Sequence, residues 1–517
     1  MKAFTEPLLS LAGFEEMTKT AEKSSGLISV TGCIDAQKSQ MIYAFGGHRK
    51  NKLIVTFGEQ KAKELYDEYS FFDKEVVYYP SKDVLFYQSD IRGNLLTAER
   101  IRALKAIREQ ERVTLVTTFD ALMNTMAPIE KMWENVLTLE LGQLLDLKEI
   151  QAALIRMGYE KEYQVQTMGQ FSVRGGILDV FPLTEENPIR IELWGDEIDT
   201  IRYFDCESQK SIENIDRVSI YPAAELVLSD EEKAGGIEKL KAEAKRVSDK
   251  LRKQMKTEEA HRVSEMADEL TEEWGELSMY AGMDAFLSYF FDERVGLLDY
   301  FNPSDSLIFF DELTRCTEQG KLTETEFSES MKQRLAMGYI LPGQMNGLFT
   351  EKEIVAKLGK YSCSALAALD NKANGLHQLG SYGIHCQSVS PYNNSFELLI
   401  KDLKRYKKNG YRVILLSGSR TRAKRLSEDI TDQGITCFYT ENYDHELFEG
   451  QIMVCYGKVR RGFEYPILKF AVITESDIFG AQQKKKKRHR TYEGEKIQSF
   501  TDLSVGDYVV HENHGLG

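Results

Sequence analysis

Hydrophobic and polar residues alternate along residues 169–205, which is the pattern of half-buried β-strands. In the first strand that this pattern predicts, Phe171 and Val173 fall on one face, and Ser172 and Arg174 fall on the other. Turns that contain glycine or proline separate the alternating segments. The pattern therefore predicts a small sheet of hairpins with one face on a core and the other in water.

The water side of this predicted sheet has an unusual composition. In the segment Ile189–Trp194 the isoleucines and the leucine point to the core, whereas Arg190 and Trp194 point to water, as does Arg174 of the first strand. Arginine and tryptophan are enriched at the hot spots of protein interfaces. The alternation leaves two interpretations open, a surface that binds a partner or an ordinary sheet surface with Trp194 packed under a neighbouring loop.

The rest of the chain alternates between predicted strands and helices, which favours parallel sheets with helices on both faces. A first region has predicted strands at residues 27–32, 53–57, 76–79 and 113–117 and helices at 59–69, 95–107 and 119–126. A second region has predicted strands at 384–389, 412–417, 437–439, 451–456 and 470–474 and helices at 396–407 and 419–433. Between the two regions, apolar residues in 237–251 follow helical spacing, with lysine and glutamate on the solvated face.

Composition and charge limit the class of protein. The 517 residues are enough for about three or more domains, and 42% of them are hydrophobic. A net charge of −15 excludes a protein that coats nucleic acid with its whole surface, because phosphate binding needs a positive footprint. The seven cysteines are scattered without a CxxC motif, which indicates free thiols in a reducing compartment. No apolar run or signal pattern indicates a membrane, so we expect a soluble, cytoplasmic protein.

A strand, a glycine turn and a helix are predicted at residues 27–45, which is the context of a phosphate-binding loop. On the motif GxxxxGK[ST], Gly32, Lys38 and Ser39 match, but Gln37 replaces the second glycine. The loop must bend tightly so that backbone N–H groups converge on phosphate, and a side chain with a Cβ opposes that bend. We therefore interpret these residues as a degenerate nucleotide site.

Residues 306–312 place four apolar residues before Asp311 and Glu312. In a nucleotide-hydrolysing enzyme, the aspartate of such a strand helps to hold Mg²⁺ and the glutamate acts on the attacking water. The same string fits a buried strand that ends in two solvated carboxylates, and the altered loop favours this second interpretation. Lys38 and Asp311 are then remnants of one ancestral site, and no residue is assigned a catalytic role.

A basic run lies near the end of the chain, in residues 481–495, and predicts a solvated linker. Its candidate nucleic-acid contacts are Lys484, Lys485, Lys486, Lys487 and Arg488. Such a run could also meet phosphate, with an affinity that falls steeply with salt. His511 and His514 have no further ligand cluster nearby, so we interpret them as turn residues and expect no metal site.

The order Phe-x-Val-Arg-Gly-Gly-Ile-Leu-Asp-Val-Phe-Pro, followed by Arg-Ile-Glu-Leu-Trp-Gly-Asp-Glu-Ile-Asp, resembles one known module. It is the module that the excision-repair protein UvrB shares with bacterial transcription-repair coupling factors, and in both families it docks onto UvrA. The resemblance implies that Arg174, Arg190 and Trp194 make the UvrA contacts. Two positions depart from the UvrB pattern: Ser172 stands where UvrB usually has a further arginine, and Trp194 stands where phenylalanine is usual.

Other segments also resemble the coupling factors. Helix signals resume at Leu95, which leaves no room for the aromatic-rich hairpin of UvrB. The strings Arg-Gly-Phe-Glu and Ile-Thr-Glu-Ser-Asp-Ile-Phe-Gly resemble a small coupling-factor domain, and Asp-Tyr-Val-Val-His-x-x-His-Gly-Leu-Gly resembles the start of the RNA-polymerase-interacting module. The implied α/β multidomain organisation is a degenerate RecA/helicase-like parallel sheet at 1–130 and 220–340, an inserted α+β UvrA-binding module at 131–219, a small α/β domain at 345–480, a basic linker at 481–498 and the first strand of a β-barrel-like module at 499–517.

The resemblance implies a recruitment scaffold, the N-terminal segment of a coupling factor that links stalled RNA polymerase to excision repair. It implies UvrA and the RNA polymerase β subunit as partners. Double-stranded DNA, ATP and Mg²⁺ are expected only for the motor domain that follows in the family, so we expect a fragment or a truncated product that binds no cofactor. The alternative is an active UvrB-like ATP-dependent helicase that uses Lys38, Ser39, Asp311 and Glu312. A third option is a DNA-binding module that works through the basic run.

Overall fold

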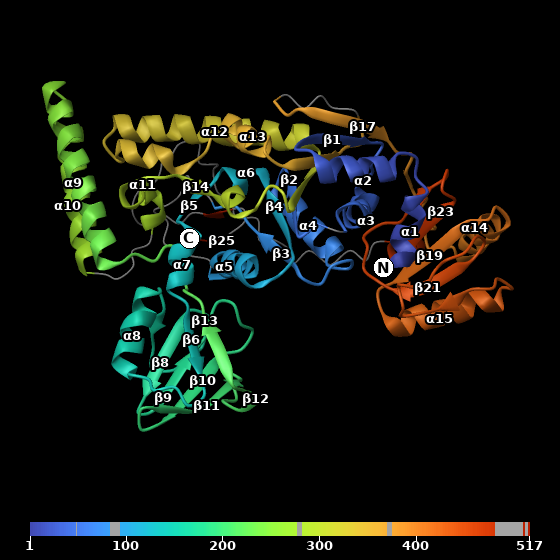
Figure 1. The fold of residues 1–517 in the computed structure, drawn as a ribbon, viewed down its shortest axis with the longest axis horizontal. Coiled ribbons are helices and arrows are strands. Elements are labelled where there is room, and N and C mark those ends of the chain that lie inside the picture. Colours follow the sequence, from blue (N-terminus) through green and yellow to red (C-terminus); the bar gives the residue numbers. More distant parts are fainter. Residues whose placement is uncertain are drawn as a thin grey trace. The chain divides into compact units, whose positions relative to one another are not determined.

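The computed structural model describes residues 1–47, 49–82, 94–276, 282–369, 375–480, 510–511 and 515–516 (Figure 1). They form two compact units. Residues 16–31 and 45–382 make the larger unit, and residues 1–15, 32–44 and the described residues from 383 onward make the smaller unit. Both units contain parallel sheets with helices, which confirms the predicted mixed α/β class. None of the helices in the described ranges has the length and apolar character that a membrane crossing requires.

A seven-stranded sheet forms the centre of the larger unit, in the order β17-β1-β16-β15-β2-β4-β3. Its strands are β1 (Gly26–Thr31), β2 (Asn51–Thr56), β3 (Val76–Tyr79), β4 (Val113–Thr118), β15 (Ser306–Asp311), β16 (Ser362–Leu366) and β17 (Gln378–Gly383). The pairs from β1 through to β3 are parallel. Both β4 and β15 are buried at every residue, as strands covered on two faces must be.

Helices and short elements complete this unit around one large apolar core. They are α2 (Phe14–Lys23), α4 (Glu59–Tyr69), α5 (Asn94–Glu109), α6 (Phe119–Met123), α7 (Ile129–Glu134), α11 (Leu287–Phe290), α12 (Leu313–Ala336), α13 (Glu351–Leu358), and the antiparallel pair β5 (Thr125–Met126) and β14 (Val295–Gly296). The four strands predicted before residue 130 all occur within a residue or two of their predicted bounds.

The strand β16 is the element that the sequence analysis missed. The predicted boundary at residue 345 assigned it to the second α/β domain, but β16 lies between β1 and β15 in the first sheet. Four of its residues Ser-Cys-Ser-Ala-Leu are small and none carries a β-branched side chain, although all five are buried. Strand propensity rests on branched and aromatic side chains, so nothing in this segment marks a strand.

A helical hairpin stands at one end of the larger unit (Figure 1). It consists of α9 (Asp230–Lys253) and α10 (Thr257–Glu276), which pack against each other through a separate apolar cluster. The predicted stripe along α9 is confirmed, because Leu240, Ala244 and Leu251 are buried in that cluster.

The first turn of α9 is held by a capping box. The Ser229 side chain accepts a hydrogen bond from the Glu232 backbone, and Glu232 accepts one from the Ser229 backbone. We expect Ser229→Ala to lower the free energy of unfolding by about 1 kcal/mol, because it removes one half of this reciprocal pair. Urea unfolding of the two proteins measures the difference, and equal midpoints would contradict a role for the cap.

The smaller unit is built on a second sheet, in the order β18-β22-β23-β19-β21-β20. Its elements are α1 (Lys2–Leu9), α3 (Asp35–Gly46), β18 (Gln387–Ser388), α14 (Phe396–Lys408), β19 (Arg412–Ser417), α15 (Arg420–Asp432), β20 (Phe438–Tyr439), β21 (Ile452–Tyr456), β22 (Phe463–Tyr465), β23 (Phe470–Thr474) and α16 (Glu475–Phe479). The strands β19, β20, β21 and β23 pair in parallel, and β22 runs antiparallel to β23. The second predicted α/β region is therefore present.

Residues 1–15 and 32–44 belong to this smaller unit, whereas the sequence predicted one domain that contains all of residues 1–130. The reason is a set of direct bonds. The Gln40 amide donates to the Phe4 carbonyl, Tyr465 donates to Gln40 at 3.1 Å, and the Ala3 N–H donates to the Tyr443 carbonyl at 3.0 Å. Helix α1 is thus tied to the segment between β20 and β21, and α3 is tied to β22, several hundred residues later in the chain.

Two sequence predictions concern the end of the chain. The basic run with Lys484–Arg488 lies outside the described residues. Of the predicted β-barrel-like module, the structure describes the antiparallel pair β24 (Val510–His511) and β25 (Gly515–Leu516), so the barrel stays a prediction.

Candidate partner-binding site

The alternating segment forms a six-stranded sheet within the larger unit, in the order β12-β11-β10-β9-β8-β7 (Figure 1). Its strands are β7 (Glu160–Lys161), β8 (Gln170–Arg174), β9 (Ile177–Val180), β10 (Ile189–Trp194), β11 (Glu197–Phe204) and β12 (Ser211–Ile215). The helix α8 (Leu147–Arg156) and the pair β6 (Leu137–Glu140) and β13 (Arg217–Ile220) contribute to the same apolar core. Phe171, Leu178, Ile189 and Ile191 fill that core, as the alternation predicted.

The strand register places the three candidate contact residues on the opposite face. Arg190 lies directly across from Asp179, and Asp179 lies across from Ser172, which makes one row over three strands. Arg174 lies two residues further along β8, and Trp194 lies four residues beyond Arg190 along β10. Because side chains alternate between the two faces of a strand, Arg174, Arg190 and Trp194 share the face that points away from the core.

Asp179 holds both arginines. Its two carboxylate oxygens accept from Arg190 Nε at 2.7 Å and from Arg190 Nη2 at 2.8 Å, and the second oxygen also accepts from Arg174 Nη2 at 2.8 Å. Asp179 is only 1% exposed, so the pairing lies in a region that excludes most water. We call Arg174 and Arg190 the arginine pair. A shared buried carboxylate fixes the position of both guanidinium groups before any partner arrives.

Arg190 has further contacts on its own domain. Its Nη2 donates to Gln209 at 2.8 Å, and its guanidinium lies 4.3 Å from the centre of the Phe204 ring. The hydrogen bond to Asp179 raises the pKa of Arg190 above the ordinary arginine value. Arg190 therefore stays charged, and its Nε and Nη2 groups already donate hydrogen bonds to Asp179 and Gln209 within the domain.

The three candidate residues differ in the fraction of the side chain that is exposed to solvent and so to a partner. The side chain of Arg174 is 37% exposed and that of Arg190 is 13% exposed, whereas Trp194 is 84% exposed. An indole with this exposure contradicts the alternative that a loop covers Trp194. Exposed tryptophan beside preorganised arginine is a typical composition for an interface hot spot.

Sequence reasoning missed the residues that hold the arginine pair. The alternation places Asp179 on the water side of its strand, next to Arg174 in the hairpin, so its position was available from the pattern. Its burial was not, because Gln209 and the turn after β11 approach from 30 residues further along the chain.

The degenerate phosphate loop lies in the smaller unit. Gly32 has φ +77°, and the carbonyl oxygen of Ile384 lies only 2.0 Å from the place where a Cβ would stand. Lys38 is 1% exposed, with its ammonium 3.2 Å from Asp35, and Gln37 and Ser39 are buried beside it. A carbonyl oxygen against the glycine repels phosphate, and the Gln37 side chain replaces the glycine that the loop requires. These residues do not fit a nucleotide phosphate.

Asp311 and Glu312 belong to the larger unit, at the end of the central strand β15. Asp311 is 1% exposed and accepts a hydrogen bond from Thr56 Oγ1 at 2.9 Å. Glu312 accepts from the Ala368 N–H at 3.2 Å. Both carboxylates are thus bonded within their own unit, and among the described residues no group of three His, Cys, Asp or Glu side chains could hold a metal ion.

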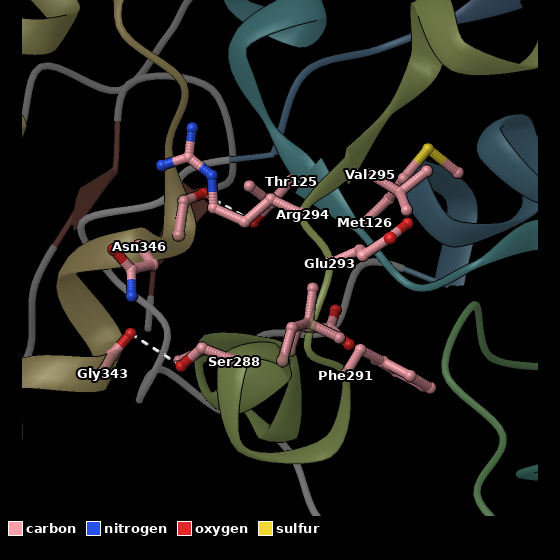
Figure 2. A pocket seen from close by; sticks show the side chains of 13 residues that line it. Thr125, Met126, Ser288, Phe291, Glu293, Arg294, Val295, Gly343 and Asn346 are labelled. Carbon is pink, nitrogen blue, oxygen red and sulfur yellow. Dashed lines mark hydrogen bonds between the residues drawn. The ribbon is translucent and has the colours of Figure 1, made fainter.

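Figure 2 shows a small pocket in the larger unit, lined by residues of β5, β14 and the segments around 284–295 and 343–347. Three of its polar side chains have partners already. Ser288 Oγ donates to the Gly343 carbonyl at 2.8 Å, Thr125 Oγ1 donates to the Gly347 carbonyl at 2.9 Å, and Arg294 pairs with Glu353 at 2.6 Å. The hydroxyl groups of Ser288 and Thr125 donate to these backbone carbonyls, so the sheet face with the arginine pair remains the candidate site.

Comparison with known proteins places this sheet in a defined class. Residues 137–226 match the UvrB interaction domain family, so the chain carries a UvrB interaction domain in its larger unit. The match covers the whole six-stranded sheet, α8, and the pair β6 and β13.

The chain as a whole is similar to the N-terminal portion of transcription-repair-coupling factors. It is 29% identical to the Bacillus subtilis transcription-repair-coupling factor over 468 residues, which are 90% of this chain and 39% of that protein. It is 29% identical to the Staphylococcus haemolyticus protein over 502 residues, covering 95% and 41%, and 28% identical to a Staphylococcus aureus protein over 519 residues, covering 98% and 42%. The resemblance drawn from the sequence is confirmed, and the chain spans about two fifths of the length of these relatives.

Proposed function

We propose that this chain is the recruitment segment of a transcription-repair coupling system and that it binds UvrA through the outer face of its UvrB interaction domain. The proposal rests on one observation: the buried carboxylate of Asp179 presents the arginine pair on the same face as an 84% exposed tryptophan. The matched domain family and the coupling-factor relatives support UvrA as the partner. The segment then acts as a scaffold that brings the excision-repair machinery to a stalled RNA polymerase.

Arg174→Ala and Trp194→Ala are each expected to weaken binding to UvrA by more than about 1 kcal/mol, the threshold for an interface hot spot. Both side chains reach solvent, so their removal changes the surface more than the core. Isothermal titration calorimetry of the full chain with purified UvrA measures the effect. The control is Ile155→Ala, because Ile155 is 40% exposed on α8, the helix that packs on the core side of the sheet. Equal affinities for all four proteins would contradict the proposal.

We further propose that residues 1–130 and 220–340 derive from a RecA-like helicase half that no longer turns over ATP. Two features that oppose phosphate binding support this proposal. Gln37 replaces the second glycine of the phosphate-binding loop, and the Ile384 carbonyl oxygen lies against Gly32. The rival is an active UvrB-like ATPase in which Lys38, Ser39, Asp311 and Glu312 assemble with Mg²⁺. Titration with a fluorescent ATP analogue and Mg²⁺ separates the two, because micromolar affinity that Lys38→Ala abolishes would establish the rival.

The resemblance to coupling factors also implies RNA polymerase and double-stranded DNA as partners of the longer proteins of this kind. We propose the RNA polymerase β subunit as the target of the module that begins near residue 499, and double-stranded DNA as the track of a motor that uses ATP and Mg²⁺. A DNA contact through Lys484–Arg488 is a separate option. Its affinity would have to fall steeply between low and high salt, because each phosphate contact releases counterions.

A further inference from the structure

Several of the most exposed large hydrophobic side chains of the described residues lie in the UvrB interaction domain. Among the described residues, six such side chains are at least 75% exposed, and three of them lie in the UvrB interaction domain: Leu144 at 75%, Tyr163 at 83% and Trp194 at 84%. Single exposed apolar residues are normal on a protein surface. What requires an explanation is that these three border the same sheet face.

Leu144 joins this face through the edge of β11. The Ile198 N–H donates to the Gln143 carbonyl at 2.9 Å, and the Leu145 N–H donates to the Asp196 carbonyl at 2.7 Å, so residues 143–145 extend the sheet. Leu144 lies across from Glu197, and Glu197 lies across from Trp194. Residues that face each other across antiparallel strands have side chains on one side of the sheet. Leu144 and Trp194 therefore share the face of the arginine pair.

Tyr163 is tied to the opposite edge by Ser172. The Ser172 hydroxyl, which is in the row of Asp179 and Arg190, donates to the Tyr163 carbonyl at 2.7 Å. The Glu162 N–H donates to the Phe171 carbonyl at 2.8 Å, which continues the ladder from β7. The serine is 1% exposed, so the chain at Tyr163 closes over it and leaves the tyrosine ring in water. The position where the UvrB pattern has a further arginine is used here to fix a loop that carries an aromatic ring.

The chemistry of this surface defines what fits it. Arg174 donates one N–H group to Asp179, and its half-exposed guanidinium has further donors for a second carboxylate. Leu144, Tyr163 and Trp194, which we call the apolar rim, offer large surfaces that exclude water around such a pair. Charged hydrogen bonds gain strength when the surrounding contacts keep water out.

We propose that Leu144 and Tyr163 are contact residues for UvrA together with Trp194, and that the matching UvrA surface presents a carboxylate between apolar side chains. The inference rests on the proposed function and extends it, because it adds two residues and names the chemistry of the partner surface. Ser172 acts as a positioning residue for Tyr163.

The test is calorimetry of the full chain with UvrA, using Leu144→Ala, Tyr163→Ala, Arg174→Ala, Arg174→Glu and Trp194→Ala. Ile155→Ala and Met255→Ala are the controls, because Ile155 lies on α8 and Met255 is 86% exposed between α9 and α10. We expect Leu144→Ala and Tyr163→Ala each to weaken binding about fivefold or more, and Arg174→Glu to weaken it more than Arg174→Ala. Ser172→Ala is expected to weaken binding less than Tyr163→Ala, and the double variant should be no weaker than Tyr163→Ala alone.

The outcomes separate the two proposals. If Leu144→Ala and Tyr163→Ala bind like the controls while Arg174→Ala and Trp194→Ala lose affinity, Leu144 and Tyr163 are not contact residues and the proposed function stands. If Arg174→Glu binds as well as Arg174→Ala, the proposal that the UvrA surface presents a carboxylate is wrong. If the unaltered chain fails to bind UvrA, the proposed function itself fails. Circular dichroism at the titration temperature confirms that each variant is folded.

Discussion

Arg100→Ala is expected to lower the free energy of unfolding of the larger unit by about 3–5 kcal/mol, because it removes the buried partner of the Glu225 carboxylate and leaves only the Lys82 ammonium, 3.0 Å away, to pair with it. Arg100 has no exposed surface and donates to Glu225 from Nε at 2.7 Å and from Nη2 at 3.0 Å. Its Nη1 donates to the Pro80 carbonyl at 2.6 Å, and the guanidinium lies 4.0 Å from the centre of the Tyr79 ring. One side chain thus joins α5, the end of β3 and the segment after β13.

Urea unfolding measures the loss, and the matched control is Arg217→Ala. Arg217 makes the same kind of pair, with Glu140 at 3.1 Å, but the two side chains are 65% and 53% exposed. A surface pair of this kind contributes less than about 1 kcal/mol. Equal losses in the two variants would contradict the assigned role of the buried pair.

The same pair makes stability depend on pH. Burial alone raises the pKa of Glu225, but the charges of Arg100 and Lys82 outweigh it and lower the pKa from 4.5 to about 2. A carboxyl whose folded pKa is below its unfolded value stabilises the fold above the unfolded pKa, and this stabilisation is lost as pH falls. The loss should therefore occur from about pH 4.5 toward about pH 2. Unfolding of Glu225→Gln should show a weaker dependence on pH in this range than the unaltered protein.

The face of the small sheet could be predicted from sequence, because a period of two fixes which side chains share a side once the strands are known. Arg174, Arg190 and Trp194 were assigned in this way, and the register of β8, β9 and β10 agrees. The prediction needed no knowledge of the partner strands. It depended only on the fact that successive side chains of a strand point to opposite faces of the sheet.

The long-range contacts that stabilise the fold could not be predicted in the same way. Arg100 and Glu225 are 125 residues apart, and no local pattern pairs them. The strand β16 has four small residues and no β-branched or aromatic side chain, and its place between β1 and β15 follows from long-range packing alone. The bond between Ser172 and Tyr163 depends on the conformation of a loop, which the alternation does not describe.

Arg190→Ala is expected to have two separate effects, on stability and on UvrA binding. It removes two of the three arginine hydrogen bonds to Asp179, which is 1% exposed, so we expect the free energy of unfolding to fall by about 2–3 kcal/mol. It also removes one guanidinium group of the arginine pair from the proposed binding face, so the affinity for UvrA should fall about tenfold. Affinity alone cannot distinguish a lost contact from a distorted domain.

The double variant Asp179→Leu with Arg190→Met separates the stability of the domain from its binding face, and because it also frees Arg174 from Asp179, it tests the arginine pair as a whole. Replacing a buried ion pair by apolar side chains of similar size is often neutral for stability, because the unpaired charge is removed together with its partner. We therefore expect the double variant to recover the free energy of unfolding to within about 1 kcal/mol of the original chain, while its affinity for UvrA stays low. Urea unfolding and calorimetry on the same preparations measure both quantities. Recovery of both would show that Arg190 only supports the domain, and the binding face would then reduce to Arg174 and the exposed side chains around it.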